Sequence, residues 1–569
     1  MASTPLRFTR SNRARAVLAA AALAIALPAS AVGAQGHPNP AEAFVTVLGT
    51  APGGTFAVPL INSGDVFDGE TFEGLPDGIG VMPVGNGKRY VDLFVNFEQS
   101  HVPFGTTSTS VFADFEDSSV LRARLDLKTQ QIVQLDEVLP PSAGYIRFCS
   151  AFMAGPAEGF NSYTLFVNEE SNDRLPVVAG AQYGADSAIA PLRQAGYTVW
   201  LDAATGEYKP IPGMGRMNHE NQVIVPGGWD DIVSVSGDDT FSAPGSQLYM
   251  YKASSPGAFK QDKGSLLAFQ VTATGADGAS PLADPYDEFN DANDYLEILA
   301  GQTWSGRFIE VPAGIAKGTE DYPDGSSNAP QESLEAWSND NNVFQFVRVE
   351  DIAYDPDDPS TIYFADTGTT RLKESGTTGR LFRAGSSGYP YWDSDGRIFK
   401  MTFNADDPTV VDEFSFIAQG RLREQQNSTT IVVTDNGAGY TGTPASALIN
   451  PDNVAISHDS IMVQEDGSSG NEVWRYAFGG GWTKIASTLA TQPADVETSG
   501  IVDMSAWMGA GWWALDVQSH GVHVGALDPT SLVPADWYTW TTAPIPPGGA
   551  QYRYHREGGQ LLLLYVPGS

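Results

Sequence analysis

The sequence contains a single cysteine, Cys149, so no intramolecular disulfide can form. Beyond its N-terminus it also lacks any apolar run near the ~18 residues that a membrane-spanning helix needs. Basic residues are scarce: 32 Lys and Arg stand against 68 Asp and Glu, which gives a formal net charge of -36. Because this charge repels nucleic acid and anionic membranes, we expect neither nucleic-acid binding nor membrane insertion. It also repels anionic substrates, unless bound cations reverse the local field.

The first 34 residues have the composition of a secretory signal peptide. Arginines precede an apolar stretch from Ala16 to Leu27, and small residues precede the candidate cleavage points after Ala31 and Ala34. The arginines are spaced apart rather than paired, which favours the general export route over the one used by folded proteins. We therefore predict a secreted or periplasmic protein whose mature chain, residues 35–569, is a single domain. An exported lone thiol oxidises unless a buried pocket or a metal ion protects it.

The hydrophobic pattern predicts an all-β protein, because the apolar runs are short, aromatic and β-branched and are bounded by Gly, Asp, Asn and Pro. Runs that end in carboxylates recur at roughly 50–70 residues with some longer gaps, which is typical of a β-propeller with about six blades. In that fold the innermost strands end at the central channel, so distant carboxylates converge there. The runs are LFVNFE (93–98), TLFVNEE (164–170), DIVSVSGDD (231–239), TIYFAD (361–366), SIMVQED (460–466) and WWALDVQ (512–518).

Residues 252–345 alternate weakly and are rich in Gly, Ala, Asp and Ser. We interpret most of this segment as a long irregular insertion that caps the central channel. An irregular surface loop without a role fits equally well. The last strand, QLLLLYVPGS, is expected to close the ring by pairing with the first blade.

Three local patterns carry candidate chemistry, and each has a structural alternative. A lone cysteine such as Cys149 is commonly a small buried hydrophobe, but a thiolate among carboxylates points to a transition metal beside calcium, because calcium takes oxygen ligands. Arg348 and Glu350 face the same way in an extended chain. They form either a cross-strand ion pair or a metal ligand beside a guanidinium that binds phosphate bidentately. The pair His219 and Glu220 is weak evidence alone.

Taken in order, seven segments resemble the PhoX family of exported bacterial alkaline phosphatases over nearly the whole mature chain. The segments are NFE (96–98), Cys149, VNEE (167–170), GRMNHE (215–220), RVE (348–350), PDNVAIS through QEDG (451–467) and ETSGIVDMS through LDVQSHG (497–521). The chain departs from the family pattern at three residues: Phe97 stands for a histidine, Val349 for a proline and Asp351 for a glycine. The twin-arginine signal is also absent.

The resemblance implies a propeller whose channel holds two ferric ions and up to three calcium ions around a bridging oxygen that attacks phosphomonoesters. Our own hypothesis for the ligands is that Cys149, Glu220 and Glu350 bind iron and that other carboxylates bind calcium, although the sequence does not determine which carboxylate binds which metal. The candidate calcium ligands are Glu98, Glu169 or Glu170, Glu465 and Glu497. Arg348 and Asn453 are the candidate catalytic residues.

We therefore expect a monomeric, metal-dependent phosphatase that acts on a small phosphate ester with iron and calcium as cofactors. Two alternatives remain open from the sequence. One is a non-catalytic, calcium-binding propeller that mediates surface interactions, with Cys149 merely buried. The other is a related phosphodiesterase, which only a panel of substrates distinguishes from a monoesterase.

Overall fold

The computed structural model describes most of the chain beyond the N-terminus. It covers residues 36–520 and 557–569, except for 37, 73, 100–116, 241–245, 275–297, 299–300, 321, 323–328, 369–382, 385–389, 394, 421, 427–428, 434–447, 467–470 and 489–495. The predicted signal peptide, residues 1–34, lies outside the described residues and stays a prediction.

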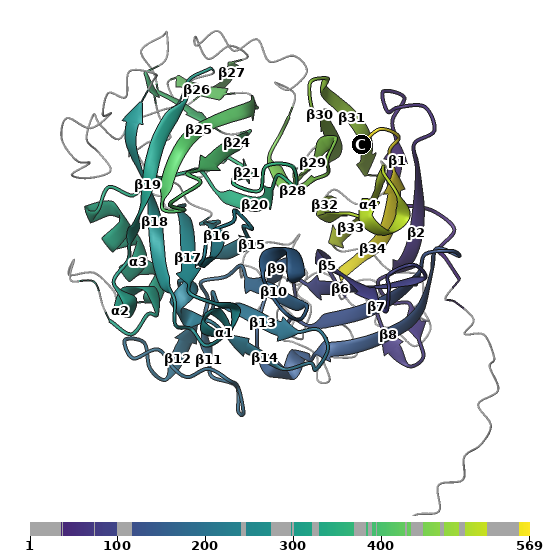
Figure 1. Cartoon of the computed structure of the whole chain (residues 1–569), viewed down its shortest axis with the longest axis horizontal. Helices are drawn as coiled ribbons and strands as arrows, with labels where there is room; N and C mark the ends of the chain where they lie inside the picture. Colours follow the sequence, from purple (N-terminus) through teal and green to yellow (C-terminus); the bar gives the residue numbers. More distant parts are fainter. Residues whose placement is uncertain are drawn as a thin grey trace, which may run out of the picture. The chain divides into compact units, whose positions relative to one another are not determined.

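The described strands form six blades, and Figure 1 shows them arranged around a centre. The first blade consists of β5 (Pro76–Val84), β6 (Tyr90–Phe97), β7 (Val120–Asp126) and β8 (Gln131–Leu139). The second consists of β9 (Phe148–Ala154), β10 (Thr164–Glu169), β13 (Thr198–Asp202) and β14 (Tyr208–Pro210). The third consists of β15 (His219–Ile224), β16 (Ile232–Asp238), β17 (Leu248–Ala253) and β18 (Ser265–Thr274). The fourth blade consists of β20 (Val349–Tyr354), β21 (Thr361–Asp366), β24 (Arg397–Phe403) and β25 (Val410–Gln419). The fifth consists of β28 (Pro451–Ile456), β29 (Ser460–Glu465), β30 (Glu472–Ala477) and β31 (Gly481–Thr488). The sixth consists of β32 (Val496–Asp503), β33 (Trp512–His520), β34 (Glu557–Tyr565) and β2 (Phe56–Asn62).

The innermost strands of the six blades, β5, β9, β15, β20, β28 and β32, follow one another around the ring. Each contacts the next, and β32 contacts β5, so the ring is closed. All pairs of neighbouring strands within the blades are antiparallel. The all-β class and the propeller architecture predicted from the sequence are confirmed.

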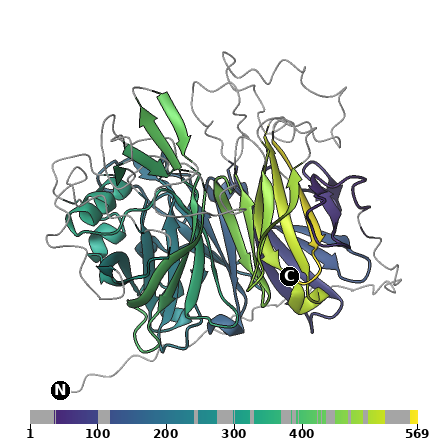
Figure 2. The same cartoon turned by 90° about the horizontal axis from the view of Figure 1, so that it is seen from above.

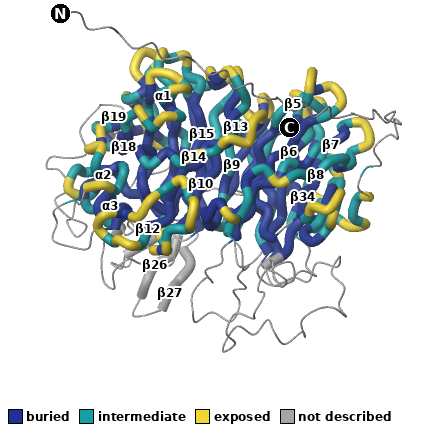
Figure 3. Tube along the Cα trace, turned by 90° about the horizontal axis from the view of Figure 1, so that it is seen from below, coloured by how far each residue is buried: buried dark blue, intermediate teal, exposed yellow. Residues whose placement is uncertain are grey.

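A hydrophobic cluster fills each seam between neighbouring blades. Successive side chains of a strand point to opposite faces, so each strand contributes to the seams on both sides of its blade. Strand β33 is an example: Leu515 and Val517 pack toward the fifth blade, whereas Ala514 packs toward the first. Figure 3 shows the result, with buried strands and exposed turns. Most of the core of the propeller therefore lies between the sheets.

Side-chain amides also connect neighbouring blades. At the same position of the second strand in four blades, an Asn or Gln donates a hydrogen bond to the innermost strand of the next blade. The donors and acceptors are Asn96 with the carbonyl oxygen of Phe148, Asn168 with that of Glu220 (2.8 Å), Gln464 with that of Ser499 (3.2 Å), and Gln518 with Oδ2 of Asp77 (2.8 Å). At the equivalent Gly237, a Cβ atom would lie 2.6 Å from the carbonyl oxygen of Val349, so the backbones themselves approach closely there.

The ring is closed by N-terminal strands that join C-terminal blades. The C-terminal strand β34 pairs with β33 and with β2, and β1 (Val45–Val47) pairs with β31. Our expectation that the last strand pairs with the first blade was therefore wrong. Its continuous apolar run, Leu561 to Leu564, is buried because β34 lies inside the sixth blade, between β33 and β2.

The segment 252–345 contains regular elements where it is described. Strand β18 lies in the third blade, and β19 (Trp304–Glu310) pairs with β18 and β25, which joins the third and fourth blades into one nine-stranded sheet. Helices α1 (Pro256–Lys260), α2 (Ala313–Ala316) and α3 (Pro330–Asp340) also belong to it. Residues 275–297 lie outside the described part, so the capping role stays a prediction.

Smaller elements complete the described chain, some of them visible from above in Figure 2. They are β3 (Val66–Phe67), β4 (Glu70–Thr71), β11 (Arg174–Pro176), β12 (Leu192–Gln194), β22 (Arg383–Ala384), β23 (Pro390–Asp393), β26 (Leu422–Gln426), β27 (Thr429–Val433), α4 (Ser505–Met508) and three 3-10 turns (Pro141–Ala143, Pro156–Glu158 and Pro212–Met214). Among the described residues, none of the helices has the length and apolar character needed to cross a membrane.

Candidate metal centre

The second residue of each innermost strand is an acidic residue or the cysteine. These six residues are Asp77, Cys149, Glu220, Glu350, Asp452 and Glu497. In the first five, the register of the ladder shifts directly after the first residue of the strand, so the second residue has no cross-strand partner. A bulge of this kind redirects the side chain. The fold thereby turns one potential ligand in each of these five blades away from the regular ladder, whereas Glu497 in the sixth blade pairs with Gln518.

In these five blades the second strand ends beside the bulge. The bulged residue is the second residue of the innermost strand. The first residue after the paired part of the second strand donates its backbone N–H to a carbonyl oxygen of the innermost chain segment, two residues before the bulged residue. The donors and acceptors are Glu98 with Leu75 (3.0 Å), Glu170 with Arg147 (2.8 Å), Asp239 with Asn218 (2.9 Å), Thr367 with Arg348 (2.9 Å) and Asp466 with Asn450 (2.9 Å). Four of these donors are acidic. Each such blade therefore places a second carboxylate close to the first potential ligand.

The carboxylate one position earlier has a different task in three blades. Glu169, Asp366 and Glu465 each accept the backbone N–H of the residue three before the bulged residue. The donors are Ile146 (2.9 Å), Val347 (3.1 Å) and Ile449 (2.8 Å). In all three blades this carboxylate thus anchors the incoming loop, and in two of them a second carboxylate, Glu170 or Asp466, follows it beside the bulged residue.

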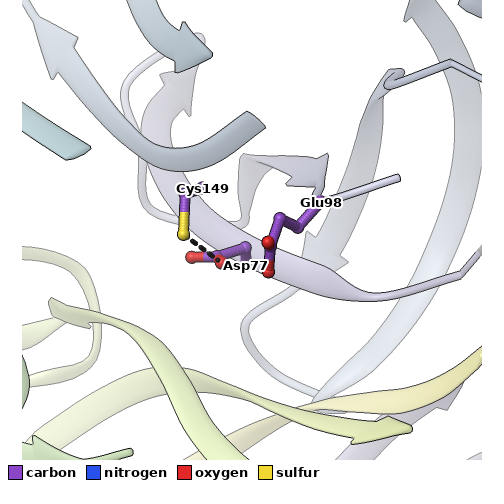
Figure 4. Close-up of side chains that lie close together, drawn as sticks. All are labelled: Asp77, Glu98 and Cys149. Carbon is purple, nitrogen blue, oxygen red and sulfur yellow. Dashed lines mark hydrogen bonds between the residues drawn. The ribbon is translucent and has the colours of Figure 1, made fainter. Parts of the chain in front are cut away.

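Among the residues that the structure describes, three groups of side chains lie close enough together to bind a metal ion. The groups are Asp77, Glu98 and Cys149; Cys149, Glu170 and Glu220; and Glu220, Glu350 and Asp452, with the potential ligand atoms of each group within 4.8 Å of one another. Figure 4 shows the first group, in which Asp77 lies between Cys149 and Glu98 and Sγ of Cys149 is 3.2 Å from Oδ2 of Asp77. Cys149 and Glu220 each belong to two groups, so the three potential sites are contiguous.

The electrostatics of the groups favour bound cations. Burial raises the pKa of Glu220 well above its usual value, and the carboxylates of Glu350 and Asp452 raise it further. Burial and Glu98 raise the pKa of Asp77 in the same way, and burial and neighbouring carboxylates raise that of Cys149. Both carboxylate oxygens of Glu220 are buried without a hydrogen-bond partner among the described residues. Cations would supply the missing partners and offset the repulsion, so this donor set fits metal ions.

A comparison with protein families decides the affiliation of the chain. The family model of alkaline phosphatase PhoX matches residues 158–503, which is more than half of the chain. The chain belongs to the PhoX family of alkaline phosphatases. As a member of the PhoX family it is a hydrolase of phosphoric ester bonds. The matched range contains Glu170, Glu220, Glu350 and Asp452, whereas Cys149 precedes it.

One solved structure shares this fold over nearly its whole length. The structure of Pseudomonas fluorescens PhoX in complex with vanadate, a transition state analogue, superimposes with a TM-score of 0.55 at 14% identity, covering 93% of this chain and 97% of that chain. The PQQ-bound aldose sugar dehydrogenase of Streptomyces coelicolor has a TM-score of 0.30 at 10% identity and covers 90% and 99% of the two chains. A search of curated proteins gave no match.

The structure of this PhoX family member brings five of the eight metal-ligand candidates into the three groups. They are Glu98, Cys149, Glu170, Glu220 and Glu350. Glu169 instead accepts two hydrogen bonds from the buried guanidinium of Arg193, and Glu465 accepts one from Nε1 of Trp474 (2.8 Å). Glu497 lies outside the groups, although the charges of Asp466 and Asp452 act on it.

Arg348 and Asn453, the candidate catalytic residues, both lie beside the groups. Arg348 has a left-handed backbone with a φ of 81° and forms a bidentate ion pair with Asp239 (2.8 and 2.7 Å) and a further ion pair with Glu350 (3.0 Å). Burial alone would lower the pKa of Arg348, but the two carboxylates outweigh it and raise the pKa. A fifth of its side chain is exposed. Asn453 directly follows Asp452 in β28, and its Oδ1 atom is buried without a partner among the described residues.

Sequence reasoning missed three acidic residues of the site: Asp77, Asp239 and Asp452. A usable signal exists for two of them, because Pro-Asp begins both β5 and β28. Asp239 ends one of the apolar runs, but nothing in its own segment indicates that its partner is Arg348, more than a hundred residues away.

A cavity of about 300 Å³ lies along the innermost strands. It is lined mainly by apolar residues of those strands, such as Val223, Ile352 and Val454. Asn221 and Asp351, which follow Glu220 and Glu350, also line it. None of the potential metal ligands of the three groups lines this cavity, so it is distinct from the metal centre.

Proposed function

We propose that this chain is an exported phosphomonoesterase whose three ligand groups hold a cluster of cations in the propeller channel. The supporting observation is Glu220, which is buried between two of the groups with both oxygens unpartnered among the described residues. A single soft sulfur ligand among carboxylates suits iron at Cys149, with Glu220 and Glu350 as further ligands. Calcium suits positions where every ligand is an oxygen, as in the one group without Cys149.

The cations explain how a chain of net charge -36 admits an anionic substrate. When bound, they act as Lewis acids on phosphoryl oxygens. Arg348 adds a positive charge at the edge of the groups, and its ion pairs with Asp239 and Glu350 fix the direction of the guanidinium. We assign to the side-chain amide of Asn453, the residue after Asp452, a hydrogen bond to a substrate oxygen. Membership of a phosphatase family favours this function over the non-catalytic propeller.

The proposal is tested on the purified full-length chain by elemental analysis and by hydrolysis of chromogenic phosphate esters. We expect bound iron and calcium, hydrolysis of a monoester in preference to a diester, and loss of activity in chelator. Glu220→Gln should lose metal and activity, whereas the control Glu332→Gln, in an exposed ion pair with Arg174, should retain both. A metal-free chain that stays fully active in chelator overturns the proposal. If the chain hydrolyses the diester in preference to the monoester, it is a phosphodiesterase and not a phosphomonoesterase.

Export is tested separately by the mass of the mature protein after fractionation of the producing cells. We expect a chain that begins after Ala31 or Ala34 in the secreted or periplasmic fraction. A chain that keeps residues 1–34 and stays inside the cell contradicts this part of the proposal. The oligomeric state, for which we expect a monomer, is measured by light scattering.

A further inference from the structure

Asp516, in the second strand of the sixth blade, is a buried carboxylate at a position that is apolar in every other blade. The residues at the equivalent position of the other five second strands are Phe94, Phe166, Val235, Tyr363 and Met462. These side chains belong to the clusters that fill the seams. Asp516 is 0% exposed, and both of its carboxylate oxygens lack a hydrogen-bond partner among the described residues. A buried charge in this situation requires a proton or a cation.

Asp516 faces the seam between the sixth and the first blade. It shares a face of β33 with Ala514, which packs against the first blade, because residues two apart in a strand point the same way. Its cross-strand neighbours are Ser499 on β32 and Leu561 on β34. Burial raises the pKa of Asp516, and the charge of Asp77, across the seam, raises it further. The carboxylate is therefore close to the first ligand group without belonging to it.

Two more unpartnered oxygens lie in the same seam. Nε2 of Gln518, two residues after Asp516, donates to Oδ2 of Asp77 (2.8 Å) and to Oε2 of Glu98 (3.2 Å). This leaves Oε1 of Gln518 and Oδ1 of Asp77 buried without a partner among the described residues. The seam thus holds two carboxylates and an amide oxygen with free acceptor capacity, and Glu98 and Asp77 are the acidic groups that face Gln518 from the first blade.

We propose that Asp516, together with Oδ1 of Asp77 and Oε1 of Gln518, binds a further calcium ion in the seam between the last and the first blade. All three ligand atoms are oxygens, which suits calcium rather than a thiophilic metal. The site rests on the proposed metal centre only through the shared Asp77. The site lies between the sixth blade and the first blade. An ion bound there would therefore stabilise the closure of the ring.

Asp516→Asn in the full-length chain tests this inference, because it removes the charge and retains the size and shape of the side chain. We expect one calcium ion fewer per chain by elemental analysis, unchanged iron, and loss of a large part of the rise in melting temperature that calcium produces. The matched control is Asp92→Asn, which changes an equally buried aspartate that is paired with Arg124 in the first blade. The control should keep every calcium ion.

If Asp516 is instead protonated and binds no ion, the Asp516→Asn variant should keep its full calcium content. This outcome overturns the inference. If Asp516→Asn does not fold, Gln518→Met provides the second measurement. This variant keeps both carboxylates, and we expect about a tenfold higher calcium concentration for half-maximal thermal stabilisation. An unchanged concentration overturns the inference. Calcium loss in Asp516→Asn supports the site even if the chain hydrolyses no ester, so the two proposals fail independently.

Discussion

Glu169 and Glu170 are adjacent in the chain and have the same side chain, but the structure gives them opposite surroundings. Glu169 is fully buried and accepts two hydrogen bonds from Arg193, at 2.9 and 2.8 Å. Glu170 lies in a group with Cys149 and Glu220. We predict that glutamine at the first position lowers stability, whereas glutamine at the second lowers metal binding and activity.

The magnitude for Glu169→Gln follows from its partner. The guanidinium of Arg193 is 0% exposed, and removal of one member of a buried ion pair costs about 3–5 kcal/mol because the other charge stays buried. The carboxylate also accepts the backbone N–H groups of Ile146 (2.9 Å) and Tyr197 (3.1 Å), which a single amide oxygen cannot fully replace. We therefore expect a loss of about 3–5 kcal/mol in the free energy of unfolding, with or without chelator.

For Glu170→Gln we do not expect a loss in the free energy of unfolding of the metal-free chain. Burial and the carboxylates of Glu220, Asp239 and Glu98 raise the pKa of Glu170, which shows that its charge is unfavourable in the metal-free chain. Its removal should leave the free energy of unfolding in chelator unchanged or higher. With metals present, the same variant loses a ligand, so bound metal and phosphatase activity should fall.

Denaturant unfolding in chelator, followed by tryptophan fluorescence, measures both stabilities, and elemental analysis with a chromogenic phosphate monoester measures metal and activity. The double variant Glu169→Gln/Arg193→Met should recover part of the lost stability, because it also removes the guanidinium charge that Glu169→Gln leaves buried without its partner. The reasoning is refuted if both single variants lose the same stability, or if Glu169→Gln stays within about 1 kcal/mol of the parent.

Four shorter predictions concern the same architecture. Asp452→Asn should reduce bound metal and initial rates, because Asp452 completes a group with Glu220; unchanged metal content would contradict this. Asn168→Ala should lower the free energy of unfolding in denaturant by about 0.5–1.5 kcal/mol, because the carbonyl oxygen of Glu220 loses one buried donor and keeps the hydroxyl of Ser150. Trp474→Phe should have an effect of similar size by calorimetry, because Glu465 loses the Nε1 donor. Chelation should lower the melting temperature of the parent chain, and a midpoint that does not respond argues against structural cations.

The sequence predicted the fold and the kind of site well, because both depend on patterns within one strand. Short alternating runs determine β-strands, and their recurrence indicates blades. Carboxylates at the ends of these runs indicate a polar channel. The choice between Glu169 and Glu170 did not follow, because it depends on Arg193 in strand β12, whose pairing with Glu169 no local pattern reveals.

Asp77 and Asp452 escaped prediction for a different physical reason. Asp77 and Asp452 begin inner strands, before the alternating part, and a bulge turns their side chains out of the ladder. Sequence periodicity describes the regular part of a strand, so it carries no information on the residue that a bulge redirects. Only the alignment of all six inner strands shows that the second residue is acidic or cysteine in every blade.

Each ligand group also takes side chains from more than one blade. Asp77 and Glu98 come from the first blade and Cys149 from the second; Glu220 comes from the third, Glu350 from the fourth and Asp452 from the fifth. These groups exist only when the blades are packed in their ring order, so bound cations stabilise the assembled ring against separated blades. Metal binding and folding of the propeller are therefore thermodynamically coupled. No single segment of the chain can form such a site alone.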